Sequence, residues 1–132
     1  MPTLPWATPT AEESGYVPQT LVMASRFELR RCRDVPAFLL AAMRIRRQML
    51  KSPGVVGVSL IAQPLRRTFY TLSAWRDRRA LDSAVAAQPH AATMAGFRTR
   101  MADSLFTFWD HPGGPPPDWA EAFQRLDAVA RA

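Results

Sequence analysis

Hydrophobic and polar positions alternate along residues 20 to 29, "TLVMASRFEL". This alternation predicts a strand with two different faces, so Phe27 falls on the face opposite Arg26. Two more β-rich segments, residues 54 to 62 and 67 to 75, are separated by the short stretch "QPLRR", which predicts a hairpin. Residues 104 to 109, "SLFTFW", form a fourth expected strand.

Helical spacing fills the intervals between these strands. A helix is predicted over residues 35 to 51, because apolar residues recur there at intervals of three and four positions. These residues are Phe38, Ala42, Ile45 and Met49. A second helix begins at the N-cap Asp77 and is interrupted by Pro89, after which the helix restarts. The restarted helix aligns His90, Met94, Phe97 and Met101 on one face.

Both ends of the chain lie outside this pattern. Residues 1 to 19 hold four prolines and predict an extended arm. Residues 110 to 117, "DHPGGPPP", predict a rigid linker, and the last residues predict a short terminal helix. The apolar stripe of that helix consists of Trp119, Phe123, Leu126 and Val129.

The element order β, α, β, β, α, β predicts an α+β, ferredoxin-like fold with a four-stranded antiparallel sheet over residues 20 to 109. The two middle strands are apolar on both faces, whereas a sheet with helices on one face needs only one apolar side. We therefore expect a homodimer in which two sheets close on each other as a dimeric α+β barrel.

The composition of the chain argues against several classes of function. The net charge is +6, but all of the 17 basic residues except Lys51 are arginines and asparagine is absent. Because this skew indicates a composition bias, nucleic acid is not an expected partner. A lone Cys32 and two histidines predict neither a disulfide nor a structural metal site. The chain shows no secretory signal or membrane span, and a cytoplasmic location is expected.

The stretch "FYTLSAWRDRRALDSAVAAQPHAATMAGFRTRM" resembles the antibiotic biosynthesis monooxygenase superfamily. There, a strand that ends in Trp and a charged turn lead into a helix with a small-residue, Pro, His segment. "AAQPHAATMAGFRTRM" is also similar to the end of spheroidene monooxygenases. The resemblance implies a dimeric α+β barrel, in a superfamily that includes cofactor-free oxygenases, heme-degrading enzymes and isomerases.

The residues of the heme-degrading members do not carry over. Those proteins use an Asn on the first strand, and this sequence contains no Asn. Their helical Trp aligns near Ala84 and their iron-binding His near Met94, one helical turn beyond His90. No cofactor is therefore expected, and heme bound by His90 stays open as an alternative.

Two residues are candidates for catalysis. His90, in the first turn of a helix that faces the sheet, suits a base toward a phenol, or it caps the helix or bonds a carbonyl. Arg26 on an apolar sheet face suits an oxyanion partner, or it pairs with Glu28 or with a carboxylate of a second copy.

Substrate-binding candidates surround these two. Trp75 would wall a pocket or simply pack at the strand end. Ser25, Thr71 and Ser73 are small polar residues that leave room for a ligand between sheet and helices. The remaining candidates, which would supply an apolar lining or simply core, are Phe27, Met94 and Phe97.

Three functions remain open. The first is a monooxygenase-like enzyme that acts on a flat, apolar, oxygenated molecule, such as a polyketide phenol or a carotenoid-like compound, without a tightly bound metal. The second is a heme-binding protein of the same fold. The third is a non-catalytic module for small-molecule binding or assembly.

Overall fold

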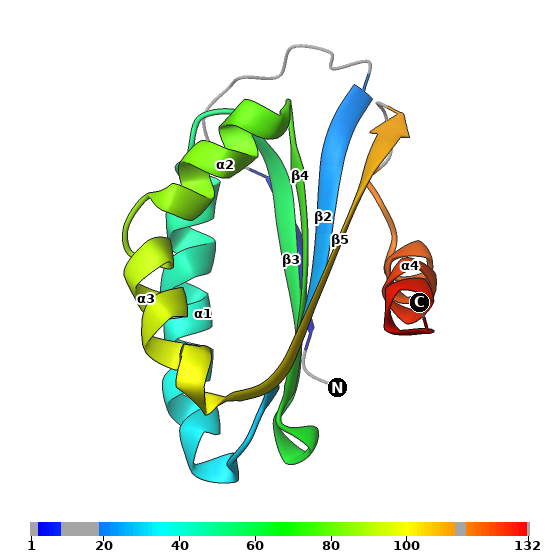
Figure 1. Cartoon of the computed structure of the whole chain (residues 1–132). Coiled ribbons are helices and arrows are strands. Elements are labelled where there is room, and N and C mark those ends of the chain that lie inside the picture. The colour runs from blue at the N-terminus through cyan, green and yellow to red at the C-terminus, as the bar shows by residue number, and fades with distance from the viewer. Residues whose placement is uncertain (1–2, 9–18, 113–115, 132) are drawn as a thin grey trace.

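The computed structural model describes residues 3–8, 19–112 and 116–131. Its centre is one five-stranded sheet in the order β1-β3-β4-β2-β5, with every neighbouring pair antiparallel (Figure 1). The strands are β1 (Thr3–Ala7), β2 (Gln19–Leu29), β3 (Val55–Gln63), β4 (Thr68–Trp75) and β5 (Met101–Pro112). The helices are α1 (Val35–Leu50), α2 (Arg78–Ala86), α3 (His90–Phe97) and α4 (Trp119–Arg131).

The ferredoxin-like prediction is confirmed by β2, α1, β3, β4, the α2 and α3 pair, and β5, which follow one another in the expected order. The sheet has five strands rather than the predicted four. The added strand, β1, comes from the predicted N-terminal arm and pairs with β3. Its Trp6 lies against Gly57, where a β-carbon would overlap the indole ring. Residues 9–18 of the arm lie outside the described residues.

Helices α1, α2 and α3 cover one face of the sheet (Figure 1). Apolar contacts hold this layer in two clusters. One surrounds Phe38 of α1, whose ring centroid lies 4.7 Å from that of Phe69 on β4. The other surrounds Trp75 and Leu81. Asp77 begins α2 as predicted, since its Oδ1 accepts from the backbone N–H of Ala80 at 2.8 Å.

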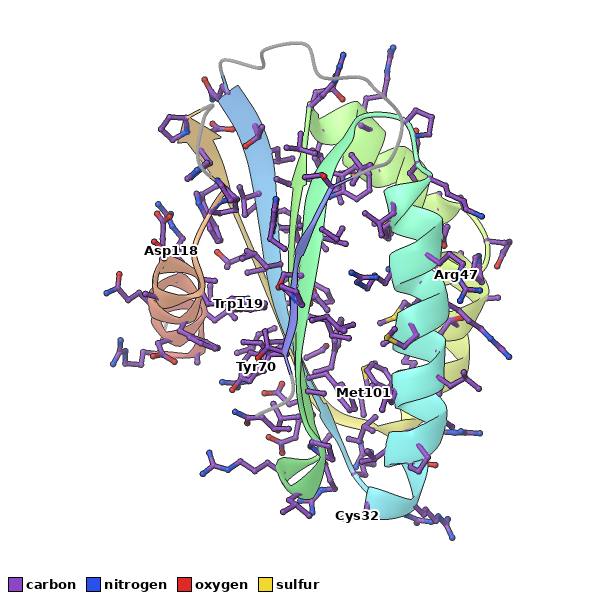
Figure 2. All side chains as sticks on the ribbon, turned by 180° about the vertical axis from the view of Figure 1, so that it is seen from behind. Cys32, Arg47, Tyr70, Met101, Asp118 and Trp119 are labelled. Atoms are coloured by element: carbon purple, nitrogen blue, oxygen red, sulfur yellow. The ribbon has the colours of Figure 1, made fainter. Side chains whose placement is uncertain are left out.

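Helix α4 lies on the opposite face of the sheet (Figure 1). Tyr70 and Trp119 fill the layer between α4 and the strands (Figure 2). The Trp119 indole N–H donates to Ser59 Oγ at 3.1 Å, and the Ser59 hydroxyl donates to Leu4 O at 2.7 Å. Leu126 packs into the same cluster. Helix α4 is thus fixed to β3 by a hydrogen bond as well as by apolar contact, and Ser59 in turn bonds β1.

The position of α4 changes the premise of the dimer prediction. The sequence predicted that a second copy of the chain covers the apolar second face of the sheet, whereas part of that face is covered by α4 of the same chain. Homodimer formation itself stays a prediction. None of the helices in the described ranges has both the length and the apolar composition that crossing a bilayer requires.

Candidate functional site

A cavity of about 360 Å³ lies between the sheet and helices α1, α2 and α3. This volume is in the range that holds small organic ligands. The cavity exists because small side chains occupy both of its walls. Ser25, Thr71 and Ser73 stand on the helix-facing side of the central strands, and Ala41 and Ala42 stand opposite them on α1. The predicted room for a ligand is therefore present.

The hydroxyl groups on the sheet side of the cavity are paired with one another or with a neighbour. Ser25 on β2 and Thr71 on β4 are directly opposite in register, and their hydroxyls form a hydrogen bond. Ser73 Oγ accepts from the Trp75 indole N–H at 2.9 Å. Because each of these hydroxyls already has one hydrogen-bond partner, the surface that the sheet side would offer a ligand is mainly apolar.

His90 lines the cavity from the first turn of α3. Gln48 of α1 fixes this turn, because its Oε1 accepts from the His90 backbone N–H at 2.9 Å and its Nε2 donates to Ala84 O at 2.9 Å. The ring Nδ1 lies 3.1 Å from Val85 O. A carbonyl oxygen only accepts, so Nδ1 carries the proton of the neutral ring and Nε2 keeps the free electron pair.

Burial favours the neutral form of the His90 imidazole. Burial lowers the pKa of His90 below its usual 6.5, and this outweighs the hydrogen bond to Val85, which raises it. A neutral imidazole with a free Nε2 electron pair is the form that a general base or a metal ligand requires. The carbonyl-bonded reading of His90 is correct, and it leaves one ring nitrogen available for chemistry.

Arg46 also lines the cavity, and the sequence prediction did not include it. Its Nε is buried and has no hydrogen-bond partner among the described residues. The signal was present in the sequence, because position 46 lies four residues after Ala42 and eight after Phe38. Those spacings place Arg46 on the apolar face of α1. The helical spacing of the sequence therefore indicates a charged residue on the side of α1 that faces the cavity.

The opening of the cavity lies beside the edge strand β5. Arg78 and Asp82 form an i, i+4 ion pair at 3.0 Å, and the Arg78 guanidinium lies 4.7 Å from the centroid of the Phe108 ring. Phe106 and Phe108 are exposed, at 44% and 40%. A mixed aromatic and charged rim of this kind suits the entry of a flat molecule.

Arg26 does not join this site. Phe27 lines the cavity, and the alternation of β2 turns Arg26 to the other face of the sheet, where its guanidinium pairs with Asp103 at 3.4 Å. The predicted catalytic pair of His90 and Arg26 is therefore wrong as a pair. The physical reason is the two-residue period of a strand, since α3 packs on the face that carries Phe27.

The other predicted residues divide into two groups. Ser25, Phe27 and Met94 line the cavity. Trp75 and Phe97 do not: Trp75 is fully buried in the core, and the Phe97 ring packs edge-on against Phe38 with centroids 5.0 Å apart. Both belong to the packing that surrounds the cavity. No cluster of three or more His, Cys, Asp or Glu side chains suited to a metal ion occurs among the described residues.

Comparison with known proteins places this geometry in context. No protein-family model matches the chain, and no curated protein matches it in sequence. Solved structures do match. A variant of SnoaB, a cofactor-independent oxygenase from Streptomyces nogalater, superposes with a TM-score of 0.57 at 16% identity, over 68% of this chain and 90% of that chain. This chain therefore shares the fold of that oxygenase.

Other structures share this fold. PA3566 from Pseudomonas aeruginosa has a TM-score of 0.65 at 13% identity, over 74% of this chain and 98% of that chain. A protein described as antibiotic biosynthesis monooxygenase has a TM-score of 0.59 at 14% identity, over 72% of this chain and 99% of that chain. At such identities the likeness concerns the fold, and the similarity to spheroidene monooxygenases stays a prediction.

Proposed function

We propose that the protein is a monooxygenase-like enzyme that oxidises a flat, apolar, oxygenated small molecule without a tightly bound metal. The observation that carries this proposal is the neutral His90 on the wall of an otherwise largely apolar cavity of about 360 Å³. The fold shared with a cofactor-independent oxygenase supports it. Polyketide phenols and related conjugated ring systems have the flat shape that this cavity suits.

The proposed chemistry begins with proton removal. His90 Nε2 takes a proton from an acidic C–H or O–H of the substrate, and the resulting anion is electron-rich enough to reduce O₂ directly. With an activated CH₂ group, the substrate supplies all four electrons. One oxygen atom becomes the new carbonyl oxygen, and the other leaves as water. The apolar walls exclude solvent and hold the reacting carbon near the imidazole.

The two histidines of the chain provide a matched test. Oxidation of anthrone to anthraquinone, followed by absorbance and O₂ uptake, is expected to exceed the uncatalysed rate with the wild-type protein. It should fall by about 100-fold or more in His90→Ala, the usual contribution of a general base. His111→Ala is the control, since His111 lies on β5 outside the cavity lining. Equal rates for wild type and His90→Ala would remove His90 from the mechanism.

Heme binding by His90 Nε2 is the alternative that the same residue offers. Titration with hemin distinguishes the two, since a Soret shift that is lost in His90→Ala would favour a heme protein. An unchanged heme spectrum at every ratio would reject that alternative. It would leave the oxygenase proposal and the non-catalytic binding module, which anthrone turnover separates.

Self-association is proposed alongside this function. Support comes from β5, which is a long edge strand with the exposed aromatic side chains Phe106 and Phe108. Such an edge offers unpaired backbone groups to a second copy. Sedimentation velocity at micromolar concentration tests the proposal, and a monomer at all concentrations would reject it.

A further inference from the structure

Arg46 is a half-buried residue of the cavity lining whose charge is not balanced by an ion pair within the described part of the chain. Its Nε is buried without a hydrogen-bond partner, and none of the ion pairs found among the described residues includes Arg46. A guanidinium does not lose its proton in a protein, so it cannot escape the cost of burial by becoming neutral. The buried Nε–H donor is stabilised when an acceptor faces it, and a negatively charged acceptor also balances the guanidinium charge.

The other charged groups of the cavity do not supply that anion. Asp82 is the single acidic residue of the described lining, and its carboxylate is engaged by Arg78 at 3.0 Å. That pair is exposed at the opening, with both side chains more than half accessible. His90 is either neutral or positively charged and so contributes no negative charge. The lining therefore has one uncompensated positive charge, at Arg46.

We propose that Arg46 binds an anionic oxygen of the ligand, so that the molecule held in the cavity is a flat apolar acid: a conjugated ring system with a carboxylate or an ionised phenol. The planar guanidinium fork matches such an oxyanion. The ring system lies against the apolar lining that includes Phe27, Phe38 and Met94. The assignment of this molecule as a substrate rests on the proposed function, whereas the anion preference rests on Arg46 alone.

The two proposed functional residues of the cavity come from two different helices. Arg46 reaches the cavity from α1 and His90 from α3. An acid anchored at Arg46 would lie in the same cavity as the His90 imidazole. Arg46 would then also stabilise the oxyanion that proton removal creates in a conjugated system.

Binding of two isosteric probes tests the anion preference. 2-Naphthoate and 2-naphthamide share the ring and differ in charge, and their affinities are measurable by naphthalene fluorescence. The wild-type protein is expected to bind the acid at least about tenfold more tightly than the amide, the effect of one charge-assisted hydrogen bond. In Arg46→Met this preference should disappear, while amide binding changes by less than about twofold.

Arg47→Met is the matched control. Arg47 is the next residue of α1, is exposed, and lies on the side of the helix that faces away from the sheet (Figure 2). The variant removes the same charge from the chain without altering the cavity, so the preference for the acid should persist. Arg46→Gln is the second variant should Arg46→Met fail to fold, as judged by circular dichroism, and it should likewise lose the preference.

An acid preference that survives in Arg46→Met or Arg46→Gln overturns the proposal, as does a wild-type protein that binds acid and amide equally or binds neither. 2,4-Dinitro-1-naphthol, which is ionised at neutral pH, is the phenolate probe and 2-naphthoate is the carboxylate probe. If the binding of only one of these two probes depends on Arg46, the ligand is assigned to the class of that probe. These assays need no turnover. If the wild-type protein prefers the acid but does not oxidise anthrone, the proposed function alone is rejected. If it oxidises anthrone but shows no anion preference that depends on Arg46, this inference alone is rejected.

Discussion

Helix α4 should stabilise the protein by covering the second face of the sheet, and Leu126→Ala tests this. Leu126 is 1% exposed and packs in the cluster with Val22, Leu72 and Trp109. Truncation of a fully buried leucine costs about 2–5 kcal/mol of unfolding free energy, from lost transfer energy and the remaining void. For a domain of this size each kcal/mol lowers Tm by about 3–4 °C, so Tm should fall by roughly 6–20 °C.

Val129→Ala is the control on the same helix. Val129 is 37% exposed, and its truncation should change the unfolding free energy by less than about 0.5 kcal/mol. Thermal unfolding by circular dichroism and urea titration measure both variants. Similar Tm values for Leu126→Ala and wild type would mean that α4 does not pack on the sheet in solution. The second face would then be free for another copy, as the sequence alone suggested.

Two further predictions concern His90 and Trp75. Burial lowers the pKa of His90 in the folded protein, so just below pH 6.5 the unfolded chain binds more protons than the folded chain. The contribution of His90 to the unfolding free energy should therefore be constant above pH 6.5 and decrease as the pH falls below that value. The pH-dependence of urea unfolding, compared between wild type and His90→Gln, measures this; Arg46, Arg78 and Asp82 line the same cavity and remain in both proteins. Identical profiles would contradict it. Trp75→Phe removes the donor to Ser73 and leaves a void, and should cost about 1–3 kcal/mol in urea unfolding without preventing the binding of 2-naphthoate.

The strand pattern held more information about the site than was drawn from it. The alternation of β2 placed Phe27 and Arg26 on opposite faces, and the structure confirms that opposition. A helix that contacts Phe27 therefore cannot bring His90 to Arg26. The two residues do not meet because the second helical segment covers the Phe27 face of the sheet, whereas Arg26 lies on the other face.

For Arg46, the sequence indicates the position of the residue but not its lack of a hydrogen-bond partner. Its position on the apolar face of α1 follows from helical periodicity alone. Its lack of a partner does not, because that depends on which side chains of β2, β4, α2 and α3 meet across the cavity. A charged residue within an apolar stripe is thus visible in the sequence, whereas its unbalanced charge is a property of the packed structure.

The sequence by itself determined the ferredoxin-like order of strands and helices, the cap at Asp77 and the placement of His90 at the start of α3, because periodicity and capping act over a few neighbouring residues. Only the tertiary structure decided three other features. These are the fifth strand, the covering of the second face by α4, and the meeting of Arg46 and His90 in one cavity. Each joins segments that are distant in sequence, and such contacts depend on how complete surfaces fit together.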